Sequence, residues 1–88
     1  MNVQYNIGFI RSLRKLSKKD ALLRKKVVEK VNLYLSDKKH PSLRLHKLQG
    51  KLKDAWNISI DRSVRILIHQ EGDDVVFVHI GSHDEVYR

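Results

Sequence analysis

The chain has 88 residues, no cysteine and a net charge of +8. This length suits one small domain, so we take residues 1–88 as a single folding unit. The lack of cysteine excludes disulfides and thiolate zinc sites, and no apolar run reaches the roughly 20 residues of a membrane-spanning helix. The first residues do not resemble a signal peptide, so we expect a cytoplasmic protein without a membrane partner.

The two parts of the chain carry opposite charge. Residues 1–53 hold fifteen basic and three acidic side chains, a net charge of +12. Residues 54–88 hold three basic and seven acidic side chains, a net charge of −4. So basic a region is typical of proteins that contact a polyanion, most commonly nucleic acid. A solvated, lysine-rich helical surface without a partner is the alternative.

The chain begins with a predicted short strand and a helix. "VQYNI" (3–7) alternates enough for a short strand. A helix follows, indicated by apolar residues at helical spacing: Tyr5, Phe9, Leu13 and Leu16. "SKKD" (17–20) is a weak capping box, in which Ser17 caps the next helix and Asp20 replaces the usual Glu.

A second helix is predicted from this point to about Ser36. Its apolar residues again recur at helical spacing: Leu23, Val27, Val31, Tyr34 and Leu35. The segment "DKKHPS" ends it, because Pro41 disfavours helical backbone at His40.

The remaining segments alternate with a period of two, as strands do: "LRLHKL" (43–48), "AWNISID" (55–61), "SVRILIH" (63–69) and "VVFVHI" (75–80). In the last of them we expect Val76, Val78 and Ile80 to share one face, and we expect Trp56 to anchor the core. Strands joined by tight turns predict an antiparallel meander. The chain is therefore expected to be α+β, with two N-terminal helices packed on one face of a small antiparallel sheet. The other face is then open for chemistry.

Arg65 is the first candidate for that chemistry. If Ile58, Ile66 and Ile68 face the helices, Ser59 and Arg65 point to the open face. A strand arginine either forms an ion pair, here with Asp61, or binds phosphate through its planar guanidinium. Both interpretations remain open at this point.

Histidines supply the proton-transfer groups. His46 is placed on a strand, and His83 follows "GS" at the end of the last strand. Two histidines near an arginine can cleave RNA without a metal, since one removes the 2′-hydroxyl proton and the other protonates the leaving oxygen. His40, His69 and His79 are weaker candidates, and we expect no metal and no cofactor. Tyr87 either packs on the sheet or stacks on a nucleotide.

Two stretches carry a family resemblance. "LHKLQGKLKDAWNISIDRSVRILI" (45–68) and "HIGSHDEVY" (79–87) resemble the RelE/ParE superfamily of small bacterial toxins, in its RelE and YafQ-like branch. The resemblance implies an mRNA endoribonuclease that enters the ribosomal A site, contacts 16S rRNA and cuts the codon there without a metal. It also implies a cognate antitoxin as partner, and we expect the free toxin to be a monomer.

The resemblance also implies catalytic roles. His46 resembles a proton-transfer histidine, Arg65 the arginine that stabilises the scissile phosphate, His83 the general acid, and Tyr87 the aromatic that orients the substrate. Basic residues around these positions are expected to bind RNA: Arg44, Lys47, Lys51 and Lys53.

The chain departs from the family pattern at Ser59, where YafQ-like members have a histidine, and near Ser63, where they have an aspartate. The general base is therefore open between His46 and a lysine, Lys51 or Lys53. Two other functions stay in view. One is a ParE-like inhibitor of DNA gyrase, and the other is a catalytically silent module that binds RNA or an antitoxin.

Overall fold

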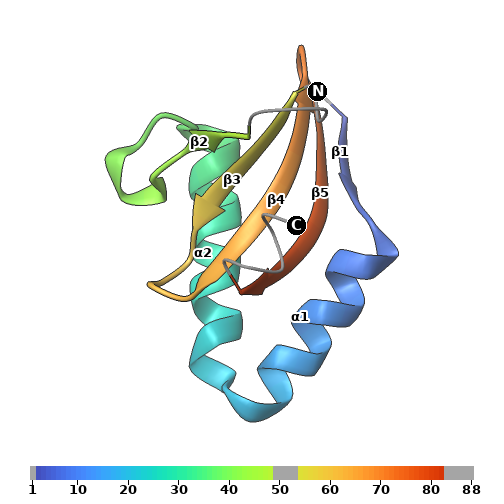
Figure 1. Cartoon of the computed structure of the whole chain (residues 1–88), viewed down its shortest axis with the longest axis vertical. Coiled ribbons are helices and arrows are strands. Elements are labelled where there is room, and N and C mark those ends of the chain that lie inside the picture. Colours follow the sequence, from blue (N-terminus) through green and yellow to red (C-terminus); the bar gives the residue numbers. More distant parts are fainter. Residues whose placement is uncertain (1, 49–53, 83–88) are drawn as a thin grey trace.

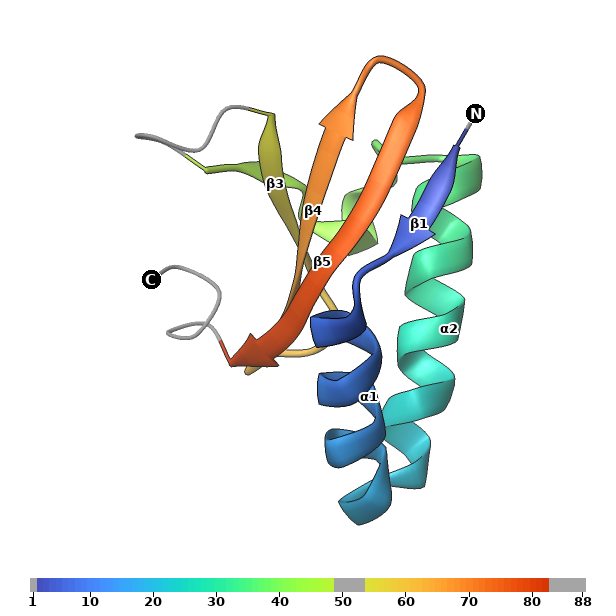
Figure 2. The same ribbon diagram turned by 90° about the vertical axis from the view of Figure 1, so that its right-hand side faces the viewer.

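The structure of the chain is a computed structural model that describes residues 2–48 and 54–82. Its elements, in chain order, are β1 (Val3–Tyr5), α1 (Ile7–Lys19), α2 (Ala21–Ser36), the 3-10 helix η1 (Pro41–Leu43), β2 (His46–Lys47), β3 (Ala55–Ser59), β4 (Val64–Glu71) and β5 (Asp74–Ser82). The strands form one five-stranded sheet in the order β1-β5-β4-β3-β2 (Figure 1). Both helices lie on the same side of this sheet (Figure 2).

The predicted α+β architecture is confirmed. Strands β2 to β5 form the expected antiparallel meander, whereas β1 pairs with β5 in parallel. The parallel pair makes the sheet mixed. The two helices follow β1 in the chain, and the last strand, β5, then comes to lie beside β1. Alternation of side chains along a strand indicates its faces but not its direction, so this pairing was not predictable from the pattern.

The core lies between the helices and one face of the sheet. The helices contribute side chains at the predicted positions, and these are buried: Phe9, Leu23, Val27, Val31 and Tyr34. Phe77 of β5 is fully buried at the centre of an aromatic cluster, with its ring centroid 5.1 Å from that of Tyr5 and 5.8 Å from that of Phe9. Aromatic pairs in this distance range add attraction beyond the burial of apolar area.

The start of α2 is capped by Asp20, not by Ser17. The Asp20 carboxylate accepts a hydrogen bond of 3.1 Å from the backbone N–H of Leu23. Helix α1 continues through Ser17 to Lys19, and the Ser17 hydroxyl donates to the carbonyl of Arg14. The prediction of Ser17 as the cap was wrong because aspartate immediately before the helix satisfies the same free N–H groups.

The predicted strand over residues 43–48 is mostly absent. Pro41 begins the short helix η1, in which the His40 ring accepts a hydrogen bond from the Ser42 N–H at 3.2 Å. Arg44 then takes a left-handed conformation with φ 48°, so only His46 and Lys47 form strand β2. Proline favours the first turn of a helix, which explains why helical rather than extended backbone follows His40.

A bulge changes the faces of β5. The register of β4 and β5 shifts between Leu67 and Ile68, so Ile66 is paired with Ile80 but Ile68 with Phe77. As a result Phe77 and Ile80 are both fully buried in the core, although they are three residues apart. The prediction that Val76, Val78 and Ile80 share one face was therefore wrong, since a bulge adds one residue to one strand only.

Trp56 is not the core anchor that its position suggested. Its side chain is half-buried and lies outside the main core cluster. The Lys47 ammonium lies 5.7 Å from the centroid of the Trp56 ring, a distance at which a cation is attracted to the ring face. Within residues 2–48 and 54–82, no helix is long and apolar enough to cross a membrane.

Candidate functional site

The face of the sheet away from the helices carries polar side chains in two cross-strand rows. One row runs across four strands in register: His46, Asn57, Leu67 and His79. The next row, closer to the β3–β4 turn, contains Ser59, Arg65 and Gly81. The prediction that Ser59 and Arg65 share the open face is therefore confirmed by their direct pairing.

Three arginines surround a pocket beside the second row. The pocket has a volume of about 240 Å³ and brings together η1, the following loop and the β3–β4 turn; its lining residues are Ser42, Arg44, Ser59, Ile60, Asp61, Arg62 and Arg65. We call it the arginine pocket. Among the lining residues, Ser59 is buried, with 8% of its surface exposed, whereas Arg44 and Arg62 are exposed. Such an arrangement of guanidinium groups and hydroxyls favours an anion.

Arg65 is held by backbone carbonyls, and no ion pair of its guanidinium is found within the described residues. Its Nη1 donates to the carbonyl oxygen of Asp61 and, at 3.2 Å, to that of Val64. The alternative interpretation of Arg65, an ion pair with the Asp61 carboxylate, is therefore wrong for this structure. Both hydrogen bonds use Nη1, so among the described residues Nη2 and Nε have no hydrogen-bond acceptor and can bind a ligand.

Asp61 organises the turn below Arg65. Its carboxylate accepts hydrogen bonds of 2.9 Å from the N–H groups of Ser63 and Val64, and a longer one from the Ser63 hydroxyl. Burial alone would raise the pKa of Asp61, but these hydrogen bonds and the charge of Lys26 outweigh it and lower the pKa below its ordinary value. The carboxylate therefore stays ionised and acts as a structural acceptor.

Asn57 is a site residue that the sequence interpretation missed. It is 2% exposed, and its Nδ2 has no hydrogen-bond partner within the part of the chain that the structure describes. A buried amide without a partner costs stability, so its Nδ2 is a candidate donor to a ligand on the open face. The only signal in the sequence was an amide inside the apolar alternation of "AWNISID".

His46 and His79 lie in the same cross-strand row, separated by Asn57 and Leu67. His46 is exposed on β2, as the prediction of a strand histidine required. His79 is half-buried, and its Nδ1 lies 3.4 Å from the Ser12 hydroxyl of α1. His79 was considered a weak candidate; the structure places it in the same cross-strand row as His46, with two strands between them and with its ring in contact with α1.

The basic residues predicted to bind RNA divide into two groups. Arg44 lines the arginine pocket, and Lys47 is exposed beside Trp56. Lys51 and Lys53 lie outside the described residues.

His83 and Tyr87, predicted as general acid and substrate-orienting aromatic, also lie outside the described residues. The described chain ends at Ser82, which is paired with Val64, while the preceding Gly81 is paired with Arg65. The residue before His83 in the sequence is therefore next to the arginine end of the sheet.

Comparisons with known proteins bear on this fold. Neither a protein-family model nor a curated protein matches the sequence. A chain of the E. coli DinJ–YafQ toxin–antitoxin complex matches with a TM-score of 0.83 and 16% sequence identity, over 99% of this chain and 97% of that chain. A copper-bound mutant toxin from Helicobacter pylori matches with a TM-score of 0.80 and 24% identity, over 98% of each chain. The chain has the RelE/YafQ-like toxin fold.

A third matching structure has a lower TM-score and a lower sequence identity than these two. A chain of the YoeB–YefM complex from Staphylococcus aureus has a TM-score of 0.77 and 12% identity, over 94% of this chain and 97% of that chain. The fold implied by the resemblance is thus confirmed along nearly the whole length of the chain. At such low identity, fold does not carry function, which has to be argued from the site.

Proposed function

We propose that this chain is the toxin of a toxin–antitoxin pair and a ribosome-dependent endoribonuclease that cleaves mRNA codons in the A site. The observation that carries the proposal is the arginine pocket at one end of the open face of a RelE/YafQ-like fold. The fold alone would fit several activities. A polar pocket with three arginines favours a phosphate ligand, and RNA offers one at every nucleotide.

Arg65 is the residue that binds the scissile phosphate in this proposal. Its carbonyl contacts with Asp61 and Val64 fix the guanidinium before substrate arrives, so little ordering remains to be done on binding. The remaining N–H groups can donate to the two non-bridging oxygens, whose charge increases as the phosphorus becomes five-coordinate. Arg44 and Arg62 hold the adjoining backbone.

The reaction is an internal displacement. The 2′-oxygen forms a bond to phosphorus while the bond from phosphorus to the 5′-oxygen breaks, which leaves a 2′,3′-cyclic phosphate and a 5′-hydroxyl. His46 or a lysine, Lys51 or Lys53, takes the 2′-hydroxyl proton, and His83 donates a proton to the leaving 5′-oxygen. Tyr87 orients the nucleotide by stacking on it. Both proton transfers use this chain's own side chains, without a metal.

Ser59 is not suited to the role of general base, because a hydroxyl does not accept a proton near neutral pH. As a hydrogen-bond donor within the arginine pocket it can still contact a phosphate oxygen. The Nδ2 of Asn57 supplies a second donor, two residues earlier on β3 and on the same face. A substrate oxygen at this point would provide the hydrogen bond that the buried amide lacks.

An antitoxin is the expected protein partner. Matching solved structures come from toxin–antitoxin complexes of E. coli and Staphylococcus aureus. In this chain, large apolar side chains are exposed on the two helices: Ile7, Ile10, Leu22 and Val28. Apolar residues left in water on a small domain often mark a protein-binding surface, and we assign this one to the antitoxin.

The experiment is a translation assay with purified ribosomes, in which primer extension maps breaks in the message. We expect cuts within codons only when ribosomes translate, and loss of the cuts in His83→Ala and Arg65→Ala. Arg24→Ala, which removes an exposed arginine of α2, is the matched control and should cut like wild type.

Other outcomes distinguish the alternatives. An intact message together with inhibited DNA supercoiling would identify a gyrase inhibitor. An intact message with RNA or antitoxin binding retained would identify a silent module, which the replacement of the family histidine by Ser59 favours. Cleavage that disappears with a chelator would contradict the metal-free chemistry.

A further inference from the structure

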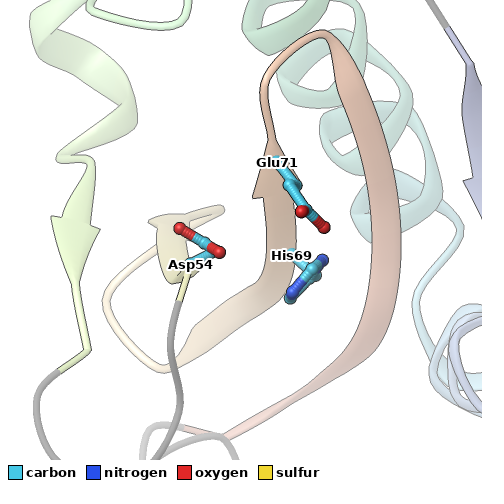
Figure 3. Close-up of side chains that lie close together, drawn as sticks. All are labelled: Asp54, His69 and Glu71. Atoms are coloured by element: carbon cyan, nitrogen blue, oxygen red, sulfur yellow. The ribbon is translucent and has the colours of Figure 1, made fainter.

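Three side chains with metal-binding atoms meet at the other end of the open face. They come from the residue just before β3 and from the end of β4: Asp54, His69 and Glu71 (Figure 3). One ligand atom from each residue can be chosen so that all three lie within 4.8 Å of one another. We call this set the acidic-end cluster.

The backbone explains why these residues meet. His69 and Glu71 are two positions apart on β4, so they point to the same face. Between them, the Gln70 N–H donates a hydrogen bond of 2.9 Å to the Asp54 carbonyl, which fixes Asp54 directly across from the pair. Asp54 has φ 57°, a left-handed conformation that aspartate tolerates better than most residues.

The three side chains are available to a ligand. In the part of the chain that the structure describes, no hydrogen bond or ion pair engages the carboxylates of Asp54 and Glu71 or the His69 ring. A pocket of about 200 Å³ adjoins the cluster and is lined by Asn2, Gln4, His69, Glu71, Asp74, Val75 and Val76. Water molecules and further oxygen ligands can complete a coordination shell there.

We propose that the acidic-end cluster binds one divalent transition-metal ion, with zinc as its best-suited occupant. An imidazole nitrogen with two carboxylates suits zinc, whereas calcium and magnesium prefer shells made of oxygen alone. Ligand atoms on a tetrahedral zinc lie about 3.4 Å apart for bonds of about 2.1 Å. The three ligand atoms, now within 4.8 Å of one another, would move closer to reach that separation.

The ion would join β3 to β4 at the end of β4 remote from Arg65, the proposed phosphate-binding residue. Arg65 and Glu71 are six residues apart on β4, which corresponds to about 20 Å along a strand. We therefore expect zinc to act on the structure and not on the scissile phosphate. It would hold Asp54, and with it the start of β3.

The test is zinc titration by calorimetry of the full chain after removal of metal, followed by thermal unfolding with and without zinc. We expect one zinc ion per chain and a higher melting temperature when it is bound. His69→Ala, Asp54→Asn and Glu71→Gln should each weaken binding at least tenfold. Two control variants should bind zinc within about twofold of wild type: Asp73→Asn in the neighbouring turn, and His46→Ala on β2.

A second measurement locates the ion independently of these variants. Manganese, added as a paramagnetic probe, should broaden the backbone NMR signals of Ala55 and Gln70 before that of Arg65. Absence of saturable zinc binding would overturn the proposal. Zinc binding that survives His69→Ala but is lost in His46→Ala would also overturn it, because the ion would then be bound at His46 and not at the acidic-end cluster.

Discussion

The two ends of β4 carry opposite chemistry on one face of one strand. At its start, Arg65 lies among other arginines in the arginine pocket, and its guanidinium is fixed by backbone carbonyls. At its end, His69 and Glu71 face Asp54, and no partner engages these side chains within the described residues. The first end suits a phosphate and the second suits a cation. A small sheet can thus separate two functions by about 20 Å simply through the order of residues along one strand.

Neutralising the arginine end should have the largest effect. Arg65→Gln removes the charge that we assign to the scissile phosphate, and loss of such a donor lowers a rate by roughly 100-fold to 1,000-fold. Arg65→Lys keeps the charge but loses the planar fork, so it should restore only part of the activity. The rate of codon cleavage in the purified translation assay measures both.

The opposite end provides the matched control for this comparison. Asp73→Asn removes one negative charge from the exposed β4–β5 turn, outside both sites, and should leave cleavage within about twofold of wild type. If net charge alone set the rate, Asp73→Asn would raise cleavage where Arg65→Gln lowers it, and such opposite changes would argue against a phosphate site at Arg65.

Asn57 lies on β3 between the arginine pocket and the acidic-end cluster. A substitution there should change stability and activity in opposite directions. Asn57→Leu replaces a buried amide that lacks a partner by an apolar side chain of similar size, so the free energy of unfolding should rise by about 1 kcal/mol. Cleavage should fall by roughly tenfold because a donor to the substrate is lost. Urea unfolding and the translation assay measure the two effects.

A more stable Asn57→Leu variant with full activity would remove Asn57 from the site. A less stable variant would indicate that the amide has a structural role instead.

Much of the fold was predictable because it depends on local periodicity. The helical stripe that includes Phe9, Val27 and Val31 faces the core as expected. The errors occur where one residue overrides a pattern. Pro41 begins a helical turn in a segment that alternates like a strand, and the extra residue of the β5 bulge moves Phe77 into the core.

The site was less predictable than the fold. Arg65 and His46 could be predicted as candidates because their segments alternate like strands and their chemistry is specific. Arg44 and Arg62 come from a left-handed position and a turn, so only the folded chain brings them beside Arg65. His69 was considered weak for a similar reason, since Asp54 lies fifteen residues earlier in the sequence.

The exposed arginines should have a smaller effect than Arg65, and one that depends on salt. Each cationic contact to a phosphate of single-stranded RNA contributes about 0.7 to the slope of log affinity against log salt concentration. Arg44→Gln and Arg62→Gln should each reduce that slope by about this amount, which titrations of a labelled RNA at several salt concentrations measure. Arg24→Gln, on α2, should leave the slope unchanged. An unchanged slope in both pocket variants would exclude them from RNA contact.

The smallest expected effect concerns Asp61 and is lost in acid. Burial opposes ionisation, but the hydrogen bonds from Ser63 and Val64 prevail, so the pKa of Asp61 in the folded chain lies below its ordinary value of 3.8. A carboxylate with a lowered pKa stabilises the fold above the unfolded value, and this contribution is lost as the pH falls through the folded value. Asp61→Asn should therefore be less stable than wild type near neutral pH, and the difference should shrink as the pH drops below 3.8. Urea unfolding at a series of pH values measures it. A difference that stays constant in acid would mean that the turn below Arg65 depends on the shape of Asp61 and not on its charge.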